Sequence, residues 1–221
     1  MTTEMKTLLV SETFTSIQCE STYIGRPCFT IRLATCNLNC TYCDTRYALN
    51  AADAKECSVE ELVSMAVVSG VSFVEIAGGE PLFQKNTCLL AKELHKNNFT
   101  VLLETNGSLS VSDVPRGVIK IIDCKCPSSG ESEKMLFENF YLLKKEDEVK
   151  FIMRGEEDYK YAVNIITSFK LLKRTRKILF SPVIDKLPVK FLANWMIRDK
   201  IPAILQLPLH RIVWPGVERG D

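Results

Sequence analysis

Three cysteines, Cys36, Cys40 and Cys43, stand at C-x3-C-x2-C spacing on a polar stretch that follows an apolar run. Three thiolates this close together can wrap around one compact metal centre. A structural zinc site needs four ligands, and a cubane cluster used for electron transfer needs four cysteines. Because a fourth cysteine is missing from the motif, the spacing predicts a 4Fe-4S cluster with one open iron.

An open iron can be chelated by the amino and carboxylate groups of a methionine moiety. S-adenosylmethionine bound there would have its sulfonium against the cluster, and one electron could split a carbon–sulfur bond to give a 5′-deoxyadenosyl radical. The alternative is a zinc knuckle that takes a distant fourth ligand, such as Cys124, Cys126 or His210. The other cysteines have no partner at metal spacing and are expected to be small buried hydrophobes: Cys19, Cys28, Cys57 and Cys88.

Further polar and glycine-containing segments each follow an apolar run of strand character. They are Gly78-Gly79-Glu80-Pro81, Glu104 to Gly107, Asp123 to Pro127, Ser181-Pro182 and Gln206 to His210. In parallel α/β folds the loops at the carboxyl ends of the strands converge on the active site. We therefore expect these segments and the cysteine loop to meet at one pocket.

The elements that must position these loops alternate along the chain. Short β-branched runs predict strands at Cys28 to Leu33, Phe73 to Ile76, Thr100 to Leu103, Val118 to Ile122, Glu148 to Ile152, Lys177 to Phe180 and Ala203 to Leu207. Amphipathic stretches predict helices from Ser58 to Gly70, Asn86 to Lys96, Ser132 to Leu143, Asp158 to Lys173 and Val189 to Arg198. Alternation of this kind implies parallel strands with right-handed crossovers. The pattern predicts one α/β domain, residues 1–221, folded as a partial parallel β/α barrel.

Composition narrows the class of function. The 28 Lys and Arg nearly balance the 27 Asp and Glu, so the chain lacks the basic excess that drives nucleic-acid binding, and a small-molecule substrate is expected. The stretch from Met1 to Val10 lacks the apolar core of a secretory signal, and no uncharged run is long enough to span a membrane. We expect a cytoplasmic protein, where a reducing environment keeps the nine cysteines available to metal.

The cysteine triad followed by Gly78-Gly79-Glu80-Pro81 resembles the radical S-adenosylmethionine superfamily, in which the Gly-Gly-Glu-Pro-like strand end holds the methionine amino group. A narrower resemblance covers nearly the whole chain. The motifs that carry it are Ser16 to Ser21, Gly25-Arg26-Pro27, Phe29 to Leu33, Cys36-Asn37-Leu38, Cys43-Asp44-Thr45, Glu104 to Gly107, Asp123 to Gly130 and Leu209 to Pro215. On these motifs the chain resembles the 7-carboxy-7-deazaguanine synthase family.

The resemblance implies a carbon–nitrogen lyase that converts 6-carboxy-5,6,7,8-tetrahydropterin to 7-carboxy-7-deazaguanine and ammonia, a step towards queuosine. It also implies a shortened barrel, a homodimer, S-adenosylmethionine that is regenerated, Mg²⁺, and a cellular electron donor such as flavodoxin or ferredoxin.

Site residues follow from the same resemblance. Arg32 would grip the substrate carboxylate, and Thr45 would give its hydroxyl to Mg²⁺. The other implied substrate contacts are Ile17, Gln18, Cys19, Glu20 and Thr105. The implied cofactor contacts are Tyr42, Cys43, Asp44, Gly78, Gly79, Glu80, Gly107, Lys125, Cys126, Pro127, Gln206 and His210.

The chain departs from the family pattern at three positions. Where the family reads Gln-Gly-Glu, this chain has Gln18-Cys19-Glu20. Thr35 replaces the glycine before the first cluster cysteine, and Pro208 replaces a glutamine. If the backbone needs a positive φ at residue 19 or 35, the cysteine or threonine there would be strained. Two other functions fit the cysteine loop alone: a glycyl-radical activase, which acts on a protein substrate, and a non-catalytic zinc or iron–sulfur binding module.

Overall fold

The computed structural model describes residues 6–217 and 219–220, so part of the stretch from Met1 to Val10 lies outside the described residues. The described strands are β1 Thr7–Ile17, β2 Pro27–Leu33, β3 Lys55–Ser58, β4 Phe73–Gly78, β5 Thr100–Thr105, β6 Ile119–Asp123, β7 Glu148–Met153, β8 Lys177–Pro182 and β9 Ile204–Leu205. The described α-helices are α1 Val59–Ser69, α2 Thr87–Lys96, α3 Glu156–Ser168, α4 Val189–Asp199 and α5 His210–Val213.

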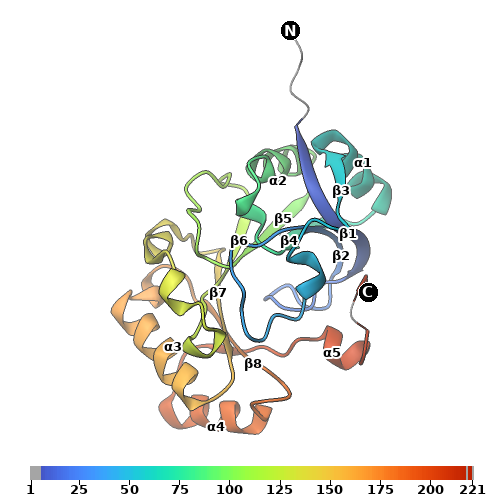
Figure 1. Ribbon diagram of the computed structural model, residues 1–221. Coiled ribbons are helices and arrows are strands. Elements are labelled where there is room, and N and C mark those ends of the chain that lie inside the picture. The colour runs from blue at the N-terminus through green and yellow to red at the C-terminus, as the bar shows by residue number, and fades with distance from the viewer. Residues whose placement is uncertain (1–5, 218, 221) are drawn as a thin grey trace.

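The strands form one sheet in the order β3-β1-β2-β4-β5-β6-β7-β8-β9. From β2 to β9 every neighbouring pair is parallel, whereas β1 pairs antiparallel with both β2 and β3. The sheet curves without closing, and α1 to α4 lie along its outer side (Figure 1). The predicted partial parallel β/α barrel is confirmed, and its parallel strands are the seven expected from the sequence.

Strands β1 and β3 were not predicted, and the antiparallel register of β1 explains why. Its pairing with β2 shifts between Val10 and Glu12. A register shift interrupts the alternation of side chains that makes a strand recognisable from its sequence. The consequence is important for the site, because β1 brings Glu12 beside Arg32 of β2.

The first helix begins and ends as predicted. The Ser58 hydroxyl accepts a hydrogen bond from the Glu61 amide, and the Glu61 carboxylate accepts one from the Ser58 amide. This reciprocal capping box satisfies two otherwise unpaired donors at the start of α1. Gly70 ends the helix in the left-handed conformation with φ of 72°, which glycine adopts without strain.

The predicted helix from Ser132 to Leu143 is wrong. The chain there forms two short 3-10 helices, Ser132–Lys134 and Phe137–Leu142. Tertiary hydrogen bonds replace the helical ones: the Leu136 amide donates to the Gly107 carbonyl, and the Asn139 side chain bonds to the loop that follows β5. The segment has the apolar periodicity of a helix, but hydrogen bonds to the loop after β5 stabilise another conformation.

The two faces of the sheet have different chemistry. Apolar residues such as Ile31, Ile76 and Phe151 are buried in the core that the helices cover. The alternate positions on the same strands carry polar side chains that line an internal cavity, among them Glu75 and Lys150. Because successive strand residues point to opposite faces, the same strands build the core and the site.

Candidate active site

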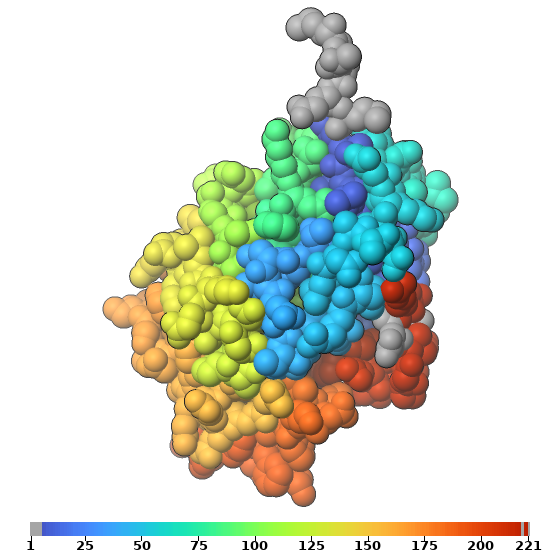
Figure 2. Space-filling model, in the orientation of Figure 1, coloured from blue at the N-terminus to red at the C-terminus, as the bar shows by residue number. Residues whose placement is uncertain are grey.

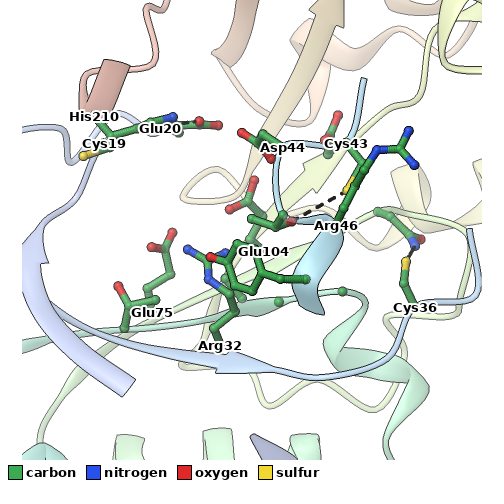
Figure 3. A pocket seen from close by; sticks show the side chains of 18 of the residues that line it. Cys19, Glu20, Arg32, Cys36, Cys43, Asp44, Arg46, Glu75, Glu104 and His210 are labelled. Atoms are coloured by element: carbon green, nitrogen blue, oxygen red, sulfur yellow. Dashed lines mark hydrogen bonds and ion pairs between the residues drawn. The ribbon is translucent and has the colours of Figure 1, made fainter. Parts of the chain in front are cut away.

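A cavity of about 630 Å³ opens on the inner side of the curved sheet. Its lining comes from β1, β2, the cysteine loop, the ends of the parallel strands and the segment around α5. Figure 3 shows Cys36 and Cys43 on one side, Glu20 and His210 on the opposite side, and Arg32 between them. Loops that are far apart in sequence thus meet at one pocket, as the sequence predicted.

All three cysteines of the motif, Cys36, Cys40 and Cys43, line this cavity. The Asn106 side-chain amide lies 3.7 Å from the sulfur of Cys36, and the Leu38 backbone amide lies 3.4 Å from the same sulfur. Burial raises the pKa of the Cys40 thiol to about 11 and also raises that of Cys36. Metal ligation must therefore displace protons, and nearby N–H groups favour the resulting thiolates.

The spacing of the donors fits an iron–sulfur cluster better than zinc. Sulfur ligands of one tetrahedral zinc at about 2.3 Å would be separated by roughly 3.8 Å. Among the described residues, however, the only trio with ligand atoms within 4.8 Å of one another is Glu20, Asp44 and His210. Cys124 and Cys126 are fully buried and absent from the cavity lining. The three thiols of the motif are therefore not gathered at the spacing of one tetrahedral zinc.

Glycines make room for this arrangement. A Cβ on Gly78 would lie 2.2 Å from the Leu33 carbonyl oxygen, and one on Gly79 would lie 2.0 Å from that of Thr35. The end of β4 therefore packs directly against the backbone that leads into Cys36. Any larger residue at either glycine would push the cysteine loop away from the strand.

Glu80 is fully buried and its carboxylate is already engaged. It accepts hydrogen bonds from the Asn106 amide at 2.6 Å, the Thr105 hydroxyl at 2.7 Å and the Leu82 amide at 3.0 Å. Burial raises its pKa despite these donors. The structure thus uses Glu80 to join the end of β4 to the loop after β5, and Glu80 is absent from the cavity lining.

Arg32 reaches the cavity from β2 and is held by its neighbour on β1. Its Nε donates to Glu12 Oε1 at 2.8 Å, and the Tyr47 hydroxyl donates to the same oxygen at 2.7 Å. Among the described residues, Nε is the only guanidinium nitrogen of Arg32 that makes a hydrogen bond to the protein. The terminal nitrogens can therefore bind an anion in the cavity.

The Gln18 side chain organises the turn that carries Glu20. Its Oε1 accepts from the backbone amides of Glu20 and Ser21, at 3.0 and 2.9 Å, and its Nε2 donates to Glu75 at 3.1 Å. Gln18 is nearly fully buried. Its hydrogen bonds fix the loop, while the Glu20 carboxylate projects further into the cavity.

A buried charged network forms the floor of the cavity. The Lys150 ammonium binds Glu20 at 2.8 Å and also Glu104. Burial lowers the pKa of Lys150, but the facing Glu104 and Glu20 carboxylates raise it more strongly. Burial and the nearby Glu104 raise the pKa of Glu75 to about 7. Such a floor offers both acceptors and a readily protonated carboxyl to a polar heterocycle.

A second ion pair lies near the cysteines. Lys125 Nζ contacts Asp123 Oδ2 at 2.5 Å, while Asp123 Oδ1 is buried without a partner among the described residues. Burial lowers the pKa of Lys125, but Asp123 and the Cys40 thiol outweigh this effect and raise it. Buried acceptors without a partner are uncommon in proteins, so Asp123 Oδ1 is available to a ligand in the cavity.

Most predicted site residues line the cavity. Those that do are Ile17, Gln18, Cys19, Glu20, Arg32, Cys36, Cys40, Tyr42, Cys43, Asp44, Thr45, Gly78, Gly79, Thr105, Lys125 and His210. Five do not: Glu80, Gly107, Cys126, Pro127 and Gln206. Sequence reasoning missed Glu12, Tyr47, Glu75, Asn106 and Lys150. Glu75 and Lys150 could have been found from the sequence, because a charged residue inside an apolar strand is uncommon and indicates a functional position.

Two of the family departures have different consequences. Thr35 has φ of 73°, so a β-branched residue occupies the left-handed region. Cys19 is not among the described residues with positive φ, and its thiol lies 3.2 Å from the Ile17 carbonyl. The glycine-to-cysteine change is thus tolerated, whereas Thr35 is strained.

The model of the radical S-adenosylmethionine superfamily matches residues 30–127. The 7-carboxy-7-deazaguanine synthase of Chlorobaculum tepidum is 40% identical over 216 residues, which cover 96% of this chain and 97% of that protein. The chain belongs to the 7-carboxy-7-deazaguanine synthase family. The synthase of Clostridium acetobutylicum is 36% identical, with 96% and 98% of the two chains covered.

Structural comparison supports the fold. The crystal structure of QueE from Escherichia coli matches with a TM-score of 0.75 at 20% identity, covering 90% of this chain and 94% of that one. As a radical S-adenosylmethionine enzyme, the protein uses a 4Fe-4S cluster and S-adenosylmethionine. Among the described residues, no helix is long and apolar enough to cross a membrane.

Proposed function

We propose that the protein converts 6-carboxy-5,6,7,8-tetrahydropterin to 7-carboxy-7-deazaguanine with loss of ammonia. The observation that carries this proposal is the common cavity of the three thiols and Arg32. A cluster site and an anion-binding guanidinium facing the same space suit a substrate that must present a carboxylate while it meets a radical. The relatives at 40% and 36% identity bear the name of this product.

When bound, the cluster and S-adenosylmethionine supply a 5′-deoxyadenosyl radical. Cys36, Cys40 and Cys43 would hold the cluster. Tyr42, Asp44, Gly78, Gly79, Lys125 and His210 line the cavity and would contact S-adenosylmethionine. Five predicted contacts are absent from the lining and would instead hold the strand ends in place: Glu80, Gly107, Cys126, Pro127 and Gln206.

Arg32 would bind the substrate carboxylate through its terminal nitrogens, because Glu12 occupies Nε. The pterin ring presents several N–H donors and N acceptors, which match the carboxylates of Glu20 and Glu104 and the readily protonated carboxyl of Glu75. Lys150 keeps Glu20 and Glu104 in fixed positions. Ile17, Gln18, Cys19 and Thr105 would complete the substrate wall, Gln18 by fixing the loop rather than by a free side chain.

We propose Thr45 as a protein ligand of Mg²⁺. Thr45 lines the cavity, and its hydroxyl makes no side-chain cap; among the described residues its one side-chain hydrogen-bond contact is with the sulfur of Cys43 at 3.8 Å. Mg²⁺ prefers oxygen ligands and retains water, so one hydroxyl with substrate oxygens can suffice. Thr45→Val should blunt the stimulation of turnover by Mg²⁺ while the brown cluster remains. Equal stimulation of both proteins would remove Thr45 from the metal site.

The cellular setting is part of the proposal. Nine free cysteines suit a reducing compartment, which supports a cytoplasmic location. A flavodoxin or ferredoxin would supply the electron. We propose that residues 1–221 act as one domain and assemble as a homodimer.

The test is anaerobic incubation of the reconstituted protein with reductant, S-adenosylmethionine and 6-carboxytetrahydropterin, followed by mass analysis. We expect 7-carboxy-7-deazaguanine and ammonia. A parallel reaction with tetrahydropterin that lacks the carboxylate cannot form the carboxylated product, so its readout is ammonia, and we expect none because Arg32 then has no partner. Production of 5′-deoxyadenosine without any change in the carboxylated pterin would refute the substrate assignment.

A further inference from the structure

The segment that follows α5 returns over the cavity. Gly216, Val217, Arg219 and Gly220 all contribute to its lining. In Figure 2 the red residues near the carboxyl terminus lie against blue residues from the first part of the chain. The central contact is the Arg219 guanidinium, whose carbon lies 4.3 Å from the centroid of the Tyr47 ring. A cation at this distance from an aromatic ring is attracted by it.

Tyr47 links this contact to Arg32. The Tyr47 hydroxyl and Arg32 Nε both donate to Glu12 Oε1, at 2.7 and 2.8 Å. On the other side, a Cβ on Gly220 would lie 3.8 Å from Glu12 Oε2, so the segment passes close to the second carboxylate oxygen. Arg219, Tyr47, Glu12 and Arg32 therefore form consecutive contacts from the segment to the cavity.

The charges around Tyr47 explain why a second arginine matters. Glu12 neutralises Arg32, and Asp44 is close enough to act electrostatically on Tyr47. The Arg219 guanidinium therefore stacks on a ring that has the carboxylates of Glu12 and Asp44 near it, and these favour a cation at this place.

We propose that Arg219 is a positioning residue for the substrate carboxylate. By stacking on Tyr47 it keeps the Tyr47 hydroxyl on Glu12, and Glu12 in turn holds Arg32 with its terminal nitrogens available to the ligand. The inference rests on the proposed role of Arg32 in substrate binding and adds a residue that acts through it.

The test is equilibrium dialysis of the reconstituted protein, with S-adenosylmethionine bound, against two fluorescent probes. One is 6-carboxypterin and the other is pterin without the carboxylate. We expect R219Q to bind 6-carboxypterin roughly twofold to fivefold more weakly, the size of an exposed cation–π contact, with unchanged binding of pterin. Y47F keeps the ring but loses the hydroxyl, so it should show the same selective loss. R176Q removes a matched exposed arginine and should bind both probes as the wild type does.

The double variant R32A/R219Q distinguishes whether Arg219 acts on the ligand through Arg32 or contacts the ligand independently. If Arg219 acts through Arg32, the double variant binds 6-carboxypterin no more weakly than R32A alone. Full additivity, or equal weakening of both probes by R219Q, would overturn the inference while leaving the role of Arg32 intact. If the wild type itself shows no preference for 6-carboxypterin over pterin, the proposed role of Arg32 and this inference both fail.

Discussion

At the scale of single residues, the cavity is lined by charged groups that are buried or nearly buried. Glu75 is the clearest case. Its carboxyl is buried on β4 with one hydrogen bond, from the Gln18 amide. Burial and the neighbouring Glu104 raise its pKa to about 7. Buried groups with raised pKa values commonly mark functional sites, because a structural role rarely needs them.

This shift predicts a pH-dependent stability difference between the wild type and Glu75→Gln. The folded protein keeps the Glu75 proton up to about pH 7, whereas an unfolded glutamate loses it near pH 4.5. The wild type therefore loses stability as the pH rises through this window, and a shift from 4.5 to about 7 corresponds to about 3 kcal/mol. The glutamine has no proton to lose and keeps an acceptor for Gln18.

Urea unfolding of the two proteins between pH 4.5 and 8 measures this difference. We expect similar stability at the acidic end and a more stable Glu75→Gln above pH 7. Exposed Glu60→Gln is the control and should follow the wild type. A difference that stays constant across the range would show that Glu75 titrates normally.

Thr35 has a strained backbone conformation. Its backbone accepts from the Glu80 amide and donates to the Ala48 carbonyl, both at 2.8 Å, and these bonds hold it at φ of 73°. The cost of the left-handed region is roughly 1–2 kcal/mol for a residue with a Cβ. Because neither bond uses the side chain, Thr35→Gly preserves both.

Relief of the Thr35 strain should exceed the entropy that a glycine adds to the unfolded chain. We predict that Thr35→Gly raises the free energy of unfolding by about 0.5–1 kcal/mol, measured by urea denaturation. Thr13→Gly, in the middle of β1, should lower it instead. A loss of stability in both variants would mean that the Thr35 side chain makes a compensating contact.

At the scale of elements, the parallel strands and most helices could be predicted because their signals are local. The Ser58 capping box and Gly70 show this for α1, where both ends depend on residues within the helix. The segment from Ser132 to Leu143 could not be predicted, since its conformation depends on partners in another loop. Glu12 was missed as a site residue for a similar reason, because only the β1–β2 register brings it to Arg32.

Asn139 is the residue that ties this segment down. It is almost fully buried, donates to the Gly107 and Leu109 carbonyls, and accepts from the Val111 amide. Asn139→Ala would leave the Val111 amide and the Leu109 carbonyl unpaired, each costing about 1–3 kcal/mol, while the Gly107 carbonyl keeps the Leu136 amide. We predict a loss of about 2 kcal/mol or more in urea unfolding. Asn164→Ala, on the exposed face of α3, should change stability by less than about 0.5 kcal/mol.

At the scale of the whole molecule, the curved sheet separates two tasks. Its outer face packs on the helices and supplies the apolar core, so its inner face is free to carry acids, lysines and thiols. The arrangement explains how a chain of 221 residues holds both a cluster site and a polar substrate pocket. Five predicted site residues are absent from the cavity lining, and we propose that they hold the strand ends on which the lining depends.

The central claim is that Cys36, Cys40 and Cys43 hold the centre that acts on the substrate in this cavity. The most direct measurement compares product formation by the wild type, by single Cys→Ala variants of these three residues, and by Cys57→Ala and Cys88→Ala. All are reconstituted and incubated anaerobically with reductant, S-adenosylmethionine and 6-carboxytetrahydropterin. We predict 7-carboxy-7-deazaguanine from the wild type and the last two variants, and none from the first three. Wild-type rates in any variant of the three would contradict the account.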